Sequence, residues 1–161
     1  MDLLYLDQNY LSGIVKRKAA FRELEPVLRA AVTRGAVAVP ESDVHRLESA
    51  ARPDLPLLEL LRELSAGLTL QQEHDAVERP CEWRLETVLE RDFPERRSRA
   101  SDRLDVRALA AALPRCRFVT CDAFMADVIH RTALDVRFPC ELFTGRRADV
   151  ERLRSRLAAL S

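Results

Sequence analysis

Residues 101–122 constrain the fold of this chain most, because they join an amphipathic helix to a short buried strand. Apolar residues here recur at the spacing of one helix face, at Val106, Leu109, Ala110 and Leu113. Pro114 is expected to end this helix, and Ser101 or Asp102 to cap its start. The β-prone run Phe118–Cys121 then reaches Asp122, where such a strand should stop.

The same alternation runs through most of the sequence. Helical stripes lie around residues 10–14, 21–32, 44–51, 55–64, 125–129 and 150–157, and apolar runs that predict strands lie at 3–6, 36–39, 68–70 and 136–138. Between residues 71 and 100 the pattern predicts only one helix, near Trp83 to Leu89. Helices alternating with fully apolar strands are typical of a parallel sheet covered on both faces. We therefore expect an α/β fold, a three-layer α/β/α sandwich with a mainly parallel central sheet.

The length and composition favour a single cytoplasmic domain spanning residues 1–161. A chain of 161 residues can bury a sizeable core without metal or disulfide staples. Its 26 basic and 26 acidic residues balance, so net charge does not predict a polyanionic partner. We expect no membrane segment, since no apolar run approaches about 20 residues. The four cysteines lack zinc-site spacing, and we expect them to be reduced.

Three of four candidate carboxylates stand where α/β proteins place their chemistry, and the placement of the fourth, Asp105, does not follow from spacing. Asp7 and Asp122 end two predicted strands, and Glu48 lies on the apolar stripe of the helix that follows the second strand. Asp105 is expected in the first turn of the helix that precedes the Asp122 strand. If these carboxylates converge, they repel one another unless a cation neutralises them. Oxygen ligands without histidine or thiolate favour Mg²⁺ or Mn²⁺, and the fitting chemistry is phosphodiester hydrolysis by metal-activated water.

In this ordered set of motifs the sequence resembles the PIN-domain nucleases. The opening LYLDQN resembles that family's first strand followed by Asp-x-Asn, and VHRLESA resembles the helix with its inward glutamate. SDRLDVRALAAALPRCRFVTCD resembles the third acid on an Ala-rich helix, followed by a strand that ends in Thr-x-Asp. Residues from about 55 to 100 have no counterpart and are expected to form a helical insertion.

The resemblance implies a PIN-like endoribonuclease with RNA as substrate and Mg²⁺ or Mn²⁺ as cofactor. It implies metal binding and catalysis by Asp7, Glu48, Asp105 and Asp122, supported by Asn9 and Thr120. The distance from Asp105 to Thr120 is about one residue shorter than is common in the family, so Asp102 is the alternative third acid. By the same resemblance the chain is a candidate toxin of a toxin–antitoxin pair, with a small antitoxin or a second copy of itself as partner.

Each of these residues also has a plain structural interpretation. Asp7 before Asn9 suits an ordinary turn, Glu48 is spaced to pair with Arg52, and Asp105 can complement a helix dipole. Asp122 can cap the helix that follows it, and Asp127 is an outside candidate for a ligand. The histidines lack a metal-binding spacing and are expected to be structural or exposed.

Other classes of function fit less well or remain open. Four arginines cluster just before and within the start of the helix predicted from residue 101: Arg96, Arg97, Arg99 and Arg103. They contact either RNA phosphate or only water. An aspartyl-phosphate phosphatase usually has a second Asp where Asn9 stands, and a receiver domain needs a late lysine, whereas the lysines here are Lys16 and Lys18. A catalytically inactive PIN-like module that binds RNA or protein is the main alternative.

Overall fold

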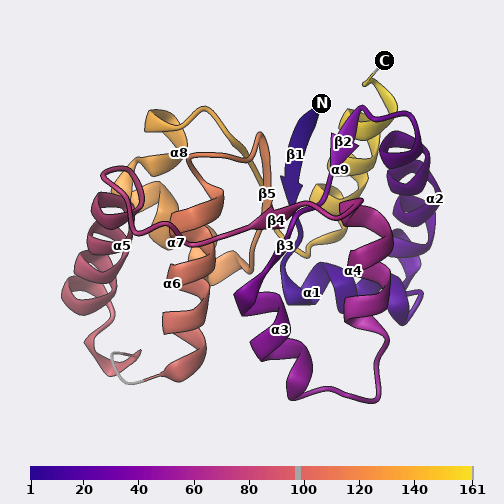
Figure 1. Ribbon diagram of the computed structural model, residues 1–161. Helices are drawn as coiled ribbons and strands as arrows, with labels where there is room; N and C mark the ends of the chain where they lie inside the picture. Colours follow the sequence, from indigo (N-terminus) through magenta and orange to yellow (C-terminus); the bar gives the residue numbers. More distant parts are fainter. Residues whose placement is uncertain (97–98, 161) are drawn as a thin grey trace.

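A computed structural model describes residues 1–96 and 99–160 (Figure 1). The strands are β1 (Asp2–Tyr5), β2 (Val37–Ala38), β3 (Glu41–Ser42), β4 (Thr69–Leu70), β5 (Phe118–Thr120) and β6 (Glu141–Phe143). The α-helices are α1 (Gln8–Val15), α2 (Ala19–Thr33), α3 (Asp43–Ala50), α4 (Leu57–Ser65), α5 (Glu78–Asp92), α6 (Ala100–Ala112), α7 (Ala123–Thr132), α8 (Leu134–Arg137) and α9 (Arg147–Ala158). A short 3₁₀ helix covers Pro94–Arg96.

The central sheet has four parallel strands in the order β2-β1-β5-β6. Its middle pair aligns Leu4 with Phe118 and Tyr5 with Val119. The short strands β3 and β4 form a separate parallel pair. The predicted parallel sheet is therefore confirmed.

Helices cover both faces of this sheet, as Figure 1 shows with α5, α6 and α7 on one side of the strands and α2, α4 and α9 on the other. Leu4 and Phe118 pack in a cluster with side chains of α1, α2, α4 and α9. Tyr5 and Val119, one position further along, pack with α5, α6 and α7. Because alternate strand residues point to opposite faces, this short apolar sheet supports two cores. The architecture is a three-layer α/β/α sandwich.

The predicted strand at residues 136–138 is wrong. Leu134–Arg137 forms helix α8, and the last strand is β6, a few residues later. Val136, which suggested the strand, is 79% exposed, so its β-propensity has no sheet neighbour to act through. In β6, by contrast, Phe143 is fully buried, and its ring centre lies 6.2 Å from that of Phe118 in the neighbouring strand, with the two rings tilted.

Two helix predictions also need correction. Helix α6 begins at Ala100 with Arg99 as its N-cap, so neither Ser101 nor Asp102 caps it. The helix predicted near Trp83 to Leu89 is the longer α5, and it packs against α6 and α7. Within the described residues, no helix has the length and apolarity that crossing a bilayer requires.

The side of β1 on which the chain adds the next strand of the parallel sheet changes after β2. From β1 it passes to β2 on one side, and it returns later to β5 on the other side. The carboxyl ends of β1 and β5 therefore flank the topological switch point, where open α/β sheets bind their ligands.

Candidate functional site

A cavity of about 280 Å³ opens at this switch point. Its walls include all six residues that the sequence placed in the site: Asp7, Asn9, Glu48, Asp105, Thr120 and Asp122. They come from the ends of β1 and β5 and from helices α1, α3 and α6. We call this space the acid cavity. The structure thus brings together side chains separated by up to 115 positions in the chain.

Asp7 is held in place by Thr120 of the neighbouring strand. The Asp7 backbone N–H donates to Thr120 Oγ1 at 2.7 Å, and that hydroxyl donates to Asp7 Oδ1 at 2.9 Å. Oδ1 also accepts from the Tyr10 N–H at 3.2 Å, so Asp7 caps α1. Burial raises the pKa of Asp7, while hydrogen bonds from Thr120, Tyr10 and Asn9 oppose that rise and the charge of Asp122 adds to it.

Asp122 occupies the equivalent position after β5. Its Oδ1 accepts from the Met125 N–H at 2.7 Å and caps α7, with backbone angles within 2° of those at Asp7. Two parallel strands side by side, each followed by an aspartate that caps the next helix, place two carboxylates at one sheet edge. Capping leaves the second oxygen of each carboxylate available, so cap and ligand are compatible roles.

Glu48 and Asp105 reach the acid cavity from two helices outside the sheet. Both side chains are half-buried, and burial raises the pKa of each to about 7. The charge of Asp7 adds to the shift of Glu48, and Glu48 and Asp122 add to that of Asp105. In the described part of the chain Glu48 forms no ion pair with Arg52. Asp105 lies in the second turn of α6, beyond the reach of a simple helix-dipole role.

The apolar face predicted for α3 is only partly right. Val44 is buried, but Leu47 is 53% exposed and Ala51 is exposed. The inward side instead carries His45 and Ser49, so α3 buries polar side chains together with Val44 against the domain.

His45 is a positioning residue that the sequence analysis treated only as structural or exposed. Its Nδ1 accepts from the Ser42 N–H at 3.0 Å, and its Nε2 lies 2.6 Å from the Leu6 carbonyl oxygen. Its ring stacks on Tyr5 at 5.1 Å. Burial lowers the pKa of His45, which keeps the ring neutral. His45 therefore connects the start of α3, the helix of Glu48, to the chain just before Asp7. The Ser-x-x-His spacing of Ser42 and His45 is the sequence pattern that could have predicted this cap.

Asp102 does not take the place of Asp105. It is 4% exposed and forms a two-pronged ion pair with Arg96, at 2.8 Å and 2.9 Å. The Arg96 guanidinium also lies 3.7 Å from the centre of the Phe124 ring. A carboxylate with both oxygens bound to one guanidinium is a poor metal ligand, so Asp105 is the better candidate for the third acid.

The predicted arginine cluster gathers beside the acid cavity. A second cavity of about 260 Å³ is lined by Arg96, Arg99 and Arg103, and Arg96 and Asp102 line both cavities. Arg97 lies outside the described residues. We call this second space the arginine cavity.

The acid cavity suits a hydrated divalent cation better than a bare one. Within residues 1–96 and 99–160, no three Asp, Glu, His or Cys side chains are arranged to hold a metal ion together. Mg²⁺, however, keeps several waters and often takes only one or two protein carboxylates. Gln8 also lines this cavity, and its Nε2 and Oε1 atoms are buried without a hydrogen-bond partner among the described residues. Ordered water in the cavity can supply the missing hydrogen bonds. The oxygen-rich lining therefore fits the predicted Mg²⁺ or Mn²⁺.

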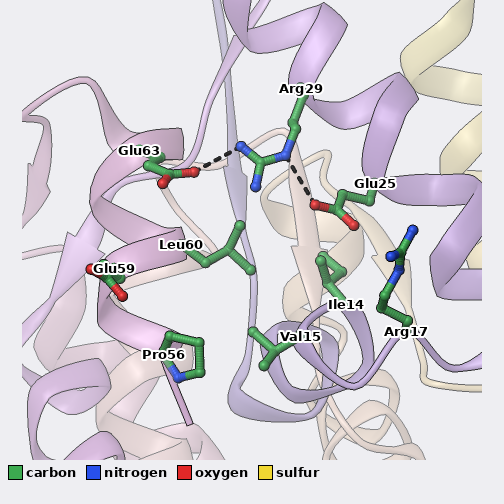
Figure 2. Close-up of a pocket in the computed structure, with 9 residues that line it drawn as sticks. All are labelled: Ile14, Val15, Arg17, Glu25, Arg29, Pro56, Glu59, Leu60 and Glu63. Atoms are coloured by element: carbon green, nitrogen blue, oxygen red, sulfur yellow. Dashed lines mark hydrogen bonds and ion pairs between the residues drawn. The ribbon is translucent and has the colours of Figure 1, made fainter.

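Other polar clusters of the described residues are weaker candidates for a functional site than the acid cavity. Figure 2 shows a cavity of about 410 Å³ between α1, α2 and α4, where Arg29 bridges Glu25 at 3.0 Å and Glu63 at 2.8 Å. These are largely exposed ion pairs of the kind that contributes little. His130 pairs with Asp135 at 2.7 Å on the surface. The four cysteines are free, as expected, and burial raises the pKa of Cys121, which makes its thiol unreactive.

Comparison with protein-family models, with curated proteins and with solved structures found no match. The description of the fold and of the acid cavity therefore rests on the structure of this chain alone. It defines an α/β protein with a carboxylate-lined site at its switch point.

Proposed function

We propose that this protein is a PIN-like, metal-dependent endoribonuclease. One observation carries the proposal: Asp7, Glu48, Asp105 and Asp122 line a single cavity at the switch point of the sheet, and burial with mutual repulsion raises the pKa of Asp7, Glu48 and Asp105. Holding several buried carboxylates together is costly unless a cation compensates them. The arginines that line the adjoining cavity favour a phosphate-bearing substrate.

In this proposal each residue of the cavity has a definite task. When bound, Mg²⁺ or Mn²⁺ supplies an activated water and charge compensation for the phosphodiester. Asp7 and Asp122 hold the cation and are themselves oriented by Thr120 and by the N-terminal N–H groups of α1 and α7. Glu48 and Asp105, whose pKa values lie near 7, can hold or accept a proton on a carboxylate oxygen at neutral pH.

Cleavage of a mixed RNA pool tests this proposal directly. We expect purified protein to cut RNA with Mg²⁺ or Mn²⁺ but not with EDTA. Asp122→Asn should lower the rate by at least about a hundredfold while keeping the helix cap, since Asn caps as well as Asp. The matched control is Asp127→Asn on the same helix, an exposed residue outside the acid cavity, which should cut normally. Equal cleavage by Asp122→Asn and wild type would mean contamination or a wrong site.

A catalytically inactive PIN-like module that binds RNA or protein is the second candidate. The absence of a ready three-ligand metal group in the described residues favours it. It predicts RNA or protein binding without any cleavage in Mn²⁺. A toxin role with a small antitoxin partner belongs to the first candidate, and growth arrest on expression that Asp122→Asn relieves would support it.

A further inference from the structure

Arg99 and Arg103 are two cations without an assigned role. Both side chains are exposed and line the arginine cavity. Neither forms an ion pair within the part of the chain that the structure describes. Most other arginines near the site are already engaged, as Arg96 is with Asp102 and Arg107 is with Asp43. The α6 side of the arginine cavity therefore carries two guanidiniums without an ion pair among the described residues.

The start of α6 adds to this positive charge. Arg99 is its N-cap, and no side-chain hydrogen bond caps the helix among the described residues. The first N–H groups of a helix and its dipole favour an anion at this end. The helix start and the two guanidiniums lie at the same cavity, so both favour an anion on its α6 side.

Three acidic residues line the arginine cavity, one from α6 and two from α5. Asp102 is neutralised by Arg96, whereas Glu86 and Glu90 come from α5, opposite α6. Burial and the charges of Glu82 and Glu90 raise the pKa of Glu86, and when ionised its carboxylate repels an anion. An anion bound here should therefore sit on the α6 side, against Arg99 and Arg103.

The acid and arginine cavities adjoin each other. Arg96 and Asp102 line both, so this rigid pair, held against Phe124, is the wall between them. A nucleic acid strand presents phosphates at regular intervals. A strand lying across this wall would put one phosphate at the acid cavity and a flanking one at the arginine cavity.

We propose that the arginine cavity binds a phosphodiester next to the one held at the acid cavity. This inference rests on the proposed function for its substrate class, but its test is independent of cleavage. Binding of a single-stranded RNA hexanucleotide is measured by fluorescence anisotropy in EDTA and again with Ca²⁺, over a range of salt concentrations.

Arg99→Gln/Arg103→Gln is the test variant, and Arg17→Gln/Arg79→Gln is the control. The control removes two exposed arginines outside both cavities, so it matches the change in net charge. We expect the test variant to bind about tenfold more weakly at low salt, with a salt slope smaller by about 0.7 for the lost phosphate contact. Glu86→Gln should bind more tightly. Because all these side chains are exposed, thermal unfolding should not change.

The outcomes separate this inference from the nuclease proposal. If the test variant loses binding while wild type cuts no RNA, the phosphate site stands and the nuclease proposal fails. If wild type cuts RNA but test and control variants bind with the same affinity and salt slope, the phosphate site is overturned. Failure of wild type to bind the hexanucleotide in either condition also overturns it.

Discussion

Glu48 and Asp105 should make the metal-free protein less stable as pH rises. Their folded pKa values of about 7 lie above the ordinary values of 4.5 and 3.8. The folded state therefore binds more protons than the unfolded state between about pH 4 and 7, and the free energy of unfolding falls across that window. Below the window both states are protonated, and above it the penalty is constant.

Urea unfolding at several pH values measures this effect. Glu48→Gln and Asp105→Asn should each flatten the decline and stabilise the protein at pH 8 by on the order of 1–2 kcal/mol, after allowance for solvent screening. Added Mn²⁺ should stabilise wild type at pH 8. A wild-type stability that rises between pH 5 and 7.5 would contradict the raised pKa values.

Thr120 should be needed for the placement of Asp7. Thr120→Val keeps the shape but removes the hydroxyl that accepts from the Asp7 N–H and donates to Asp7 Oδ1. A buried N–H left without a partner costs about 1–3 kcal/mol, so the urea midpoint should fall. Thr120→Ser keeps the hydroxyl and is the control. A Thr120→Val variant as stable as the wild type would show that this hydrogen-bond pair contributes nothing, whereas the Ser variant loses only a buried methyl group.

At the scale of elements, the contact between α1 and α2 depends on a glycine. A Cβ atom built on Gly13 would lie 2.8 Å from the ring of Phe21, which packs edge-on against Tyr10 at 5.1 Å. Gly13→Ala should therefore destabilise the protein by about 1–3 kcal/mol, because the ring must move within a packed core. Thermal unfolding measures this, with Gly145→Ala as a control where nothing lies within 4 Å. Equal effects of the two changes would contradict the close packing.

Elements could be predicted where pattern and burial agree. The strands around Leu4 and Val119 are buried on both faces, so their apolar runs were a direct signal. The strand prediction failed at Val136 because β-propensity has no effect without a neighbouring strand. The cap prediction failed at Asp102 because its carboxylate pairs with Arg96, six residues earlier, and not with the N–H groups of the helix end.

At the scale of the whole molecule, the site depends on topology. Asp7 and Asp122 could be predicted from strand ends alone, since parallel neighbours end at one edge of the sheet. The position of Glu48 and Asp105 beside these two aspartates could not be predicted, because no local sequence pattern determines how α3 and α6 are placed across β1 and β5. His45 of α3 contributes to that placement through its contact with the Leu6 carbonyl oxygen after β1, and Arg96, paired locally with Asp102, contacts the Phe124 ring of α7. The resemblance to PIN domains indicated the grouping before the geometry did.

Titration with Mn²⁺ tests the central claim, that Asp7 and Asp122 bind a divalent cation in the acid cavity, beside Glu48 and Asp105. Calorimetry should show saturable Mn²⁺ binding by wild type near pH 7.5, with proton release as Glu48 and Asp105 ionise. Asp7→Asn, which keeps the cap on α1, should weaken binding at least about tenfold, whereas Asp127→Asn on the outer surface should not. Absence of Mn²⁺ binding by wild type, or equal binding by Asp7→Asn, would contradict the claim.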